Sequence, residues 1–432
     1  MLKIRVLSIF LLVLLAACIP LTPLEEESTP EATLPGTQET EPADQPVKPT
    51  ATPGISANEL VIWLPAQFAA EDSSGWGVLS GYLDRFEEQN PGYSVSVRIK
   101  NSSGENSLLS SLALASAAAP NSVPSLVLIN RMDMESAVEK SLVSPLSETA
   151  MDADADWYEY ARNLGFFQGK LYGIPLAGDT LVLVYNSGLL TQEQINGVDS
   201  WNTLISLEKP VAFNSDDSQA LLPLTIYLSA GGIVQDEDLQ PALSIPVLTE
   251  VYRIFAQGTA NGVFPAWVKD IQDDDDAWMR FKFGEADFLV TTISSYLANR
   301  SANYTALPLP ALNTGNYALQ DGWLWAVSDR DLDRRIMAEK LAEFLSSAEF
   351  MSEWSQAAGY LPVRPSAMVS WPTQSEKTLL GKAILSLQEM PSAAVISVLQ
   401  VPIREGALKV IESGEDAFRA AEQAGKSLEL EE

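Results

Sequence analysis

The residue types that most often perform catalysis are missing or rare in this chain. It has no histidine and one cysteine among 432 residues. Because histidine is the commonest general base and the commonest metal ligand, Ser-His-Asp and Cys-His catalysis are excluded. Carboxylates are abundant, with 57 Asp and Glu residues, and a pair of them could serve a glycoside hydrolase.

The excess of acidic over basic residues limits the classes of molecule that this protein can bind. The formal net charge is -30, and nucleic acids and anionic lipid surfaces attract basic patches instead. We therefore expect no nucleic-acid partner. The four consecutive aspartates 273–276 suggest calcium, but they lack the spaced oxygen ligands and the glycine of a calcium loop. A solvated turn that caps the following helix is the simpler interpretation, and we expect no metal and no cofactor.

The only cysteine, Cys18, closes an N-terminal segment that has the character of a secretory signal. Lys3 and Arg5 precede an apolar stretch over 6–17, which is too short to cross a bilayer because a spanning helix needs ~20 apolar residues. The ending Leu-Ala-Ala-Cys resembles the bacterial lipobox, in which the peptidase cuts before a lipidated cysteine. We expect a signal peptide over 1–17 and a lipid anchor on Cys18. An ordinary signal peptide followed by an incidental cysteine is the alternative.

Residues 18–57 are rich in proline, threonine and glutamate and contain no aromatic residue. Such a segment cannot bury enough apolar surface to fold. Proline and like charges extend it to as much as ~3.1 Å per residue. We expect a disordered linker between the membrane and the folded part of the chain.

Strands and helices alternate from residue 58 onward. The apolar run 60–64 predicts a buried strand, the spacing of Leu79, Tyr82, Leu83 and Phe86 predicts a helix, and alternation over 95–99 predicts a second strand. Further strands are expected at 126–129, 181–185, 211–213 and 288–292, and helices at 108–118, 332–346, 349–358, 375–389 and, as a last pair, after 401. This order predicts an α/β fold with a parallel sheet covered by helices on both faces. The chain is too long for one compact domain, so two lobes are expected.

Short motifs follow one another along most of the chain. They are the strand 60–63 with Phe-Glu-Glu-Gln-Asn-Pro-Gly at 86–92, Gly-Lys-Leu-Tyr-Gly-Ile-Pro at 169–175 with Val-Tyr-Asn at 184–186, Phe281 with Gly-Glu-Ala at 284–286, Leu-Pro-Leu-Pro at 307–310 with Gly-Trp at 322–323, and Gly-Tyr-Leu-Pro-Val-Arg at 359–364. In this order they resemble the family 1 extracellular solute-binding proteins of ABC importers, which capture sugars and oligosaccharides. Asp287, Ser125 and the Ser-Trp-Asn at 200–202 depart from that pattern.

The resemblance implies a type II periplasmic-binding-protein-like fold of two α/β lobes. The chain would cross between them near Gly178, Leu309 and Tyr360, with the ligand in the cleft. The N-terminal lobe would comprise 58–177 plus 310–360. The C-terminal lobe would comprise 178–309 plus 361–432.

Candidate ligand contacts follow from strand ends, because open α/β sheets bind ligands beyond the carboxyl ends of their strands. By this rule they are Gln67, Phe68, Asn130, Arg131, Asp179 and Thr180. The resemblance adds Ser294, Ser295, Tyr296, Trp323, Tyr360 and Arg364.

Several of these candidates have a plain structural alternative. Asp179 is the favoured polar contact, although it could be a turn residue after Gly178. Trp323 offers a flat face to a sugar ring, but at least one of Trp323 and Trp325 should pack in the core. Arg364 could instead form a structural ion pair.

The resemblance implies a monomeric receptor without catalytic residues. It would bind a carbohydrate or similar polar solute and deliver it to ABC permease subunits, outside the cytoplasm and tethered to the membrane by lipid. A secreted carboxylate-dependent glycoside hydrolase is one alternative. A surface sensor or adhesion module with the same fold is another.

Overall fold

The computed structural model describes residues 55–147, 149–151 and 156–428. The expected signal peptide, Cys18 and all of the linker up to residue 54 lie outside the described residues. No helix in the described part is both long enough and apolar enough to cross a membrane.

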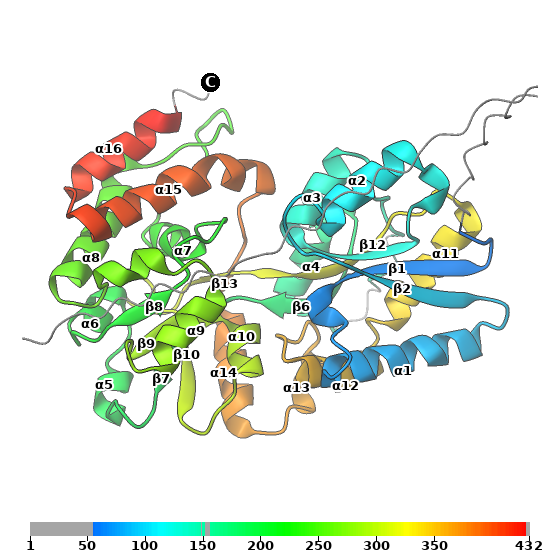
Figure 1. Ribbon diagram of the computed structural model, residues 1–432, viewed down its shortest axis with the longest axis horizontal. Helices are drawn as coiled ribbons and strands as arrows, with labels where there is room; N and C mark the ends of the chain where they lie inside the picture. The colour runs from blue at the N-terminus through cyan, green and yellow to red at the C-terminus, as the bar shows by residue number, and fades with distance from the viewer. Residues whose placement is uncertain (1–54, 148, 152–155, 429–432) are drawn as a thin grey trace, which may run out of the picture. The chain divides into compact units, whose positions relative to one another are not determined.

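The first sheet has five strands in the order β2-β1-β3-β12-β6. Its strands are β1 (Glu59–Pro65), β2 (Ser94–Lys100), β3 (Leu126–Asn130), β6 (Ile174–Asp179) and β12 (Asp321–Val327). The helices that pack on or beside it are α1 (Ser74–Gln89), α2 (Leu108–Ala118), α3 (Arg131–Glu139), α4 (Glu159–Gly165), α11 (Leu332–Phe344), α12 (Ala348–Ala358) and α13 (Pro365–Val369). Figure 1 shows the sheet lying between these helices.

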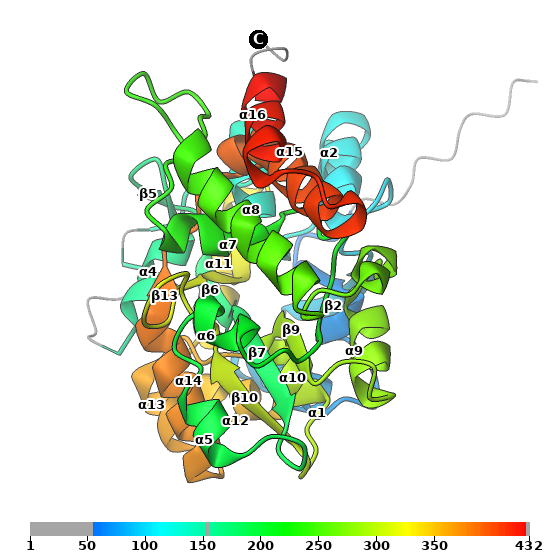
Figure 2. The ribbon, with the colours of Figure 1, turned by 90° about the vertical axis from the view of Figure 1, so that its left-hand side faces the viewer.

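The second sheet has four strands in the order β10-β7-β9-β8. Its strands are β7 (Leu181–Asn186), β8 (Val211–Phe213), β9 (Phe288–Thr292) and β10 (Tyr304–Pro308). Its helices are α5 (Gln192–Asn196), α6 (Trp201–Ile205), α7 (Leu221–Ser229), α8 (Ile245–Ala260), α9 (Asp274–Lys282), α10 (Ile293–Ala298), α14 (Gln374–Ser386), α15 (Ala393–Ser413) and α16 (Ala417–Leu428). Helices α8, α15 and α16 pack against one another at one end of this group (Figure 2).

The remaining elements are short. They are the hairpin β4 (Phe166–Phe167) and β5 (Lys170–Leu171), the parallel pair β11 (Ala318–Leu319) and β13 (Leu387–Gln388), and the 3-10 turns η1 (Ala66–Phe68), η2 (Pro120–Ser122) and η3 (Ala266–Asp270).

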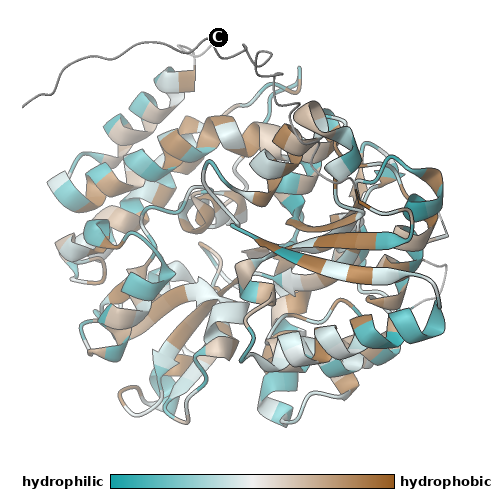
Figure 3. Cartoon of the chain, turned by 45° about the vertical axis from the view of Figure 1, so that its right-hand side comes forward, coloured by the Kyte–Doolittle hydropathy of each residue, from teal (hydrophilic) through white to brown (hydrophobic). Residues whose placement is uncertain are grey.

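The second sheet is buried on both faces, as strand β7 illustrates. Val182 and Val184 join the apolar cluster that runs through the first sheet, whereas Leu183 and Tyr185 belong to a separate cluster that also contains the buried side chains of α8 and α15. Successive side chains of a strand point to opposite faces, so an unbroken apolar run is what two covered faces require. The apolar strands stand out between more polar helices in Figure 3.

The chain passes from the first sheet to the second at Thr180, between β6 and β7. It returns between β10 and β12, and it passes to the second sheet a last time along the segment from Leu361 to α14, in which α13 still packs on α12. Two of these passages touch, because Gly178 and Leu361 exchange backbone hydrogen bonds of 2.9 and 3.0 Å. The Thr180 hydroxyl also donates to the Leu319 carbonyl oxygen at 2.8 Å, so the connecting segments are bonded side by side.

Most of the predicted elements are present, with two corrections. Strands β1, β2 and β3 are parallel as predicted, but β12 runs antiparallel to both of its neighbours, β3 and β6, so the first sheet is mixed. The helix expected after 401 begins at Ala393 and contains Pro402 in its interior. The predicted two-lobed α/β fold is confirmed.

Candidate ligand-binding site

Four aromatic side chains from separate elements meet beside the carboxyl end of β1. We name Phe68, Trp323, Trp354 and Tyr360 the aromatic group. The Phe68 ring lies 5.0 Å from Trp323 in an edge arrangement and 5.1 Å from Tyr360 in a stacked one, centroid to centroid. Tyr360 stacks in turn on Trp354 at 5.8 Å. Such contacts hold each ring in a fixed orientation.

Two glycines position this group. Gly75 lets α1 approach α12, because a Cβ at this position would lie 2.8 Å from the Cβ of Ala358. Gly359 ends α12 with φ 74°, a left-handed conformation that favours glycine. The chain therefore reverses directly before Tyr360. Gln67, Phe68, Trp354 and Tyr360 line a small cavity of about 60 Å³ here.

Only one of the two tryptophans of β12 can meet a ligand. Trp323 is partly exposed, whereas Trp325 is fully buried. Asn130, at the end of β3, is the register partner of Trp323. The strand-end rule and the resemblance thus select residues that lie next to each other on the sheet.

Five aspartates lie beyond the aromatic group, at the ends of strands and at the start of helices. We name Asp133, Asp179, Asp217, Asp274 and Asp321 the carboxylate group. Asp321 and Asp179 are register partners at the adjoining ends of β12 and β6.

The hydrogen bonds of Asp179 join the first sheet to α10. Its carboxylate accepts from the backbone N–H of Thr180 at 2.9 Å and of Ser294 at 3.1 Å, and from the Ser294 hydroxyl in a short bond. Asp274 behaves similarly, since it accepts from the Thr291 hydroxyl at 2.5 Å and from that of Ser295. Ser295 also accepts from the indole N–H of Trp278 at 2.7 Å.

Burial raises the pKa of each member of the carboxylate group. It brings the pKa of Asp321 to about 7, with the charges of Asp179, Asp133 and Asp217 adding to the effect. Burial brings the pKa of Asp179 and of Asp133 to about 6, and hydrogen bonds from Ser294 limit the rise for Asp179. The pKa values of Asp217 and Asp274 are raised by burial as well. The charged forms are thus poorly solvated.

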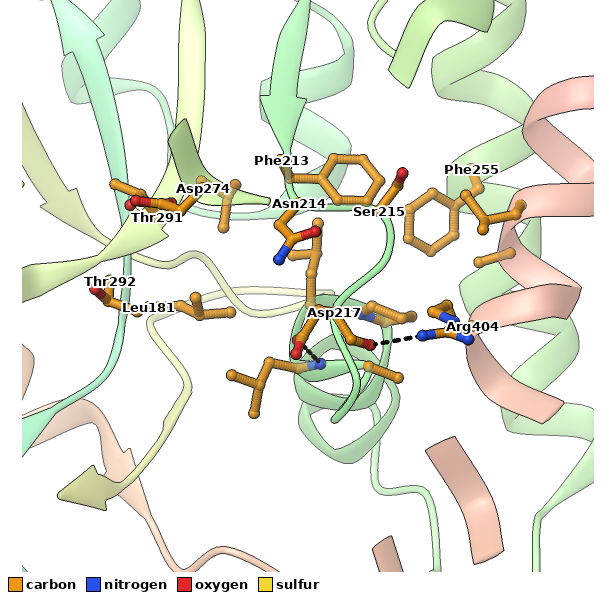
Figure 4. A pocket seen from close by; sticks show the side chains of 17 residues that line it. Leu181, Phe213, Asn214, Ser215, Asp217, Phe255, Asp274, Thr291, Thr292 and Arg404 are labelled. Carbon is orange, nitrogen blue, oxygen red and sulfur yellow. Dashed lines mark hydrogen bonds between the residues drawn. The ribbon is translucent and has the colours of Figure 1, made fainter. Parts of the chain in front are cut away.

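A cavity of about 180 Å³ adjoins this group at the carboxyl ends of β8 and β9. Its wall is mainly apolar, with Phe213 and Phe255, and its polar residues include Asn214, Asp217 and Asp274 (Figure 4). Asp217 accepts from the backbone N–H of Leu221 at 2.7 Å and so caps α7.

Asn214 and Asp217 follow β8, so the strand-end rule selects them as well, although they are not among the predicted contacts. Asp274 was missed because the run 273–276 was interpreted as a cap. That interpretation holds for Asp273, which accepts from the Asp276 N–H at 2.8 Å. Within the described residues, no three Asp, Glu, His or Cys side chains are arranged to hold a metal ion.

The structure places three other candidate residues in different surroundings. Arg131 donates to Glu135 at 2.7 Å and to the Leu164 carbonyl oxygen at 2.7 Å. Arg364 donates to the Ser346 carbonyl oxygen at 2.7 Å and lies 3.7 Å from the centre of the Trp157 ring.

Tyr296 is the third of these residues. Its pKa is raised by burial and by the charge of Glu376. Glu376 itself pairs with Arg300 at 3.3 Å.

The chain belongs to the family of bacterial extracellular solute-binding proteins, whose sequence profile matches residues 81–378. Membership places it outside the cytoplasm, and the family consists of receptors, which excludes the hydrolase alternative. No curated protein matches the sequence significantly.

Solved structures share the fold at low sequence identity. The GacH receptor of Streptomyces glaucescens, solved unliganded and with acarbose, superposes with a TM-score of 0.67 at 19% identity, over 85% of this chain and 97% of that one. Maltose-bound MalE of Listeria monocytogenes gives 0.69 at 16% identity, over 87% and 98%. UgpB of Mycobacterium tuberculosis, bound to glycerophosphocholine, gives 0.66 at 17% identity, over 87% and 98%.

Proposed function

We propose that this protein is a lipid-tethered receptor that binds a carbohydrate or similar polar solute and delivers it to the permease subunits of an ABC importer. The observation that carries the proposal is the pairing of an aromatic group with hydrogen-bonding carboxylates where the two sheets adjoin. Aromatic faces contact the apolar side of a sugar ring, and carboxylates accept hydrogen bonds from hydroxyl groups. Structurally similar proteins were solved with acarbose and with maltose.

In this proposal the lobes are 58–177 plus 310–360 and 178–309 plus 361–432. Gln67, Phe68, Asn130, Trp323 and Tyr360 act from the first. Asp179 and Thr180 lie at the crossing, with Ser294 and Ser295 behind them. Solute binding shifts the hinge equilibrium toward a closed form by as much as the solute prefers that form.

Calorimetry and thermal shift with a panel of glycans and small polar solutes test this proposal. A ligand that binds the folded state raises the melting temperature, and small-angle scattering should show compaction with that same ligand. Trp323→Ala should weaken binding about tenfold or more, ~1.4 kcal/mol. Phe418→Ala on α16, where the ring is half exposed, should leave the affinity unchanged. A panel without binding or compaction would refute the proposal.

The tether is tested separately by expressing the full chain with Cys18→Ala. The unaltered protein should sediment with membranes and incorporate a labelled fatty acid. The variant should do neither and should be released in soluble form. Equal membrane association of both would rule out the lipid anchor.

A further inference from the structure

The members of the carboxylate group come from both sides of the proposed cleft. Asp133 lies in the first turn of α3, which packs on the first sheet, and Asp321 begins β12 of that sheet. Asp217, in the turn after β8, and Asp274, at the start of α9, line the 180 Å³ cavity beside the second sheet. Asp179 stands at the crossing between them. Asp321 and Asp179 are register partners, Asp179 and Asp274 accept hydrogen bonds from the adjacent Ser294 and Ser295 of α10, and Asp274 shares the cavity with Asp217, so the group bridges the two sheets.

No basic side chain of the described part pairs directly with these carboxylates, although the charge of Arg404 lowers the pKa of Asp217 and that of Lys140 lowers the pKa of Asp133. Among the described residues, none of the five carboxylates has a Lys or Arg nitrogen within 4.0 Å. Arg404 also lines the cavity, but its guanidinium pairs with the exposed Asp216 at 3.3 Å and donates to the backbone carbonyls of Asp216 and Asp217. The site therefore has an excess of negative charge in poorly solvated surroundings.

When the cleft closes, the bound ligand determines whether this negative charge is neutralised. An anionic solute would add to the repulsion, and a neutral one would leave buried carboxylates without a counter-charge, which is costly. A directly ligated metal ion does not fit, because no three acidic side chains in the described part converge as metal ligands do. A compact organic cation would satisfy charge and hydrogen bonding together.

We propose that the solute carries a protonated amine, which this protein binds between Asp321, Asp179 and the carboxylates that line the cavity. The inference rests on the proposed function, since it names the chemical class that the same site accepts. The recognised chemistry is an ammonium group on a small polar scaffold, and an amino sugar or a short aliphatic diamine could supply it. The aromatic group and the apolar wall around Phe213 and Phe255 would hold the uncharged part.

Pairs of ligands with the same backbone but different charge distinguish the effect of charge on affinity from the effect of shape. Calorimetry at pH 7.5 would compare glucosamine oligomers with N-acetylglucosamine oligomers of equal length, and putrescine with butane-1,4-diol. In each pair the backbone is kept and only one member is cationic. We expect the cationic member to bind at least tenfold more tightly. Preference within the sugar pair assigns an amino sugar, and preference within the aliphatic pair assigns a diamine.

Variants of the carboxylate group test whether these side chains cause the preference for the cationic ligand. Asp321→Asn and Asp217→Asn, the second in the cavity wall, should each reduce the affinity for the amine about tenfold, while circular dichroism confirms that both are folded. Asp238→Asn removes the same charge from an exposed loop and should have no effect.

Equal binding of charged and neutral members, or unchanged affinity in both site variants, would overturn this inference. Binding and compaction with neutral glycans alone would overturn it while leaving the proposed function standing. If nothing in either set binds, the proposed function and this inference fall together.

Discussion

At the scale of single residues, the buried pair of Arg334 and Asp329 shows how this chain uses an ion pair for stability. The two side chains form a two-point contact of 2.7 and 2.9 Å. The Ser125 hydroxyl donates to the same carboxylate at 2.7 Å. The side chains are 13% and 2% exposed, so neither partner can turn to solvent if the other is removed. Ser125 departs from the family pattern, and this hydrogen bond gives it a structural role.

Asp329→Ala should therefore reduce the free energy of unfolding by about 3 kcal/mol, because Arg334 would stay buried without its counter-charge. Urea denaturation measures the change. The control is Glu422→Ala, which removes the exposed Lys426–Glu422 pair, at 3.8 Å, and should cost less than about 1 kcal/mol. A similar loss in both variants would contradict the argument.

Asp321 should make the folded protein less stable as the pH rises, whereas a salt-bridged aspartate makes a protein more stable as the pH rises. Its pKa is about 7 in the folded protein, against about 3.9 in an unfolded chain. Between these values the folded state holds more protons than the unfolded state, so stability falls as pH rises. Asp321→Asn should raise the melting temperature at pH 8 and flatten its change between pH 5 and pH 8. An unchanged pH profile in the variant would refute the assignment.

At the scale of elements, two helical glycines that look alike in sequence should respond oppositely to alanine. A Cβ on Gly406 of α15 would lie 2.2 Å from the Tyr252 hydroxyl oxygen, whereas a Cβ on Gly381 of α14 would meet nothing within 4 Å. Gly381→Ala should stabilise by up to about 1 kcal/mol through helix propensity. Gly406→Ala should destabilise by about 1–3 kcal/mol through overpacking. Thermal unfolding checks both, and a shift of the same sign would contradict the packing of α15 on α8.

Elements with a strong apolar period could be predicted from the sequence, and elements set by distant contacts could not. Strand β1 and helix α1 follow from their own residues. Helix α15 starts earlier than expected because its first turn is held by another element: the Glu135 carboxylate of α3 accepts from the Ala393 N–H at 2.7 Å. The antiparallel direction of β12 likewise depends on where the chain returns from the second sheet.

The same distinction holds for the candidate site. Phe68, Trp323 and Tyr360 could be found from strand ends and motifs, and the structure brings them together. Asp321 was not predicted, because its role depends on pairing with Asp179 across β12 and β6. Such pairing joins residues more than a hundred positions apart, and no local pattern encodes it.

At the scale of the whole molecule, the charges that select the ligand should also govern closure of the empty protein. Asp133 and Asp321 belong to the side of the first sheet, Asp217 and Asp274 belong to the side of the second, and Asp179 lies at the crossing between them. Like charges at close range favour separation. Of the described residues that line the cavity, only Arg404 is basic, and it pairs with Asp216. The phenol groups of Tyr160 and Tyr360 also lie near Asp179, but their pKa values are raised well above 10, so both stay neutral.

The ligand-free protein should therefore become more compact as the pH falls from 8 to about 5.5. In that range Asp321, with a pKa of about 7, and Asp179 and Asp133, with pKa values of about 6, take up protons and lose their repulsion. Small-angle scattering should record a smaller radius of gyration at the lower pH. In the double variant Asp133→Asn and Asp321→Asn the compact form should already be present at pH 8. Asp238→Asn should behave as the unaltered chain. If the radius instead stays constant across this range, the carboxylate group does not hold the lobes apart, and the hinge equilibrium is set by the packing of the connecting segments at Gly178 and Leu361.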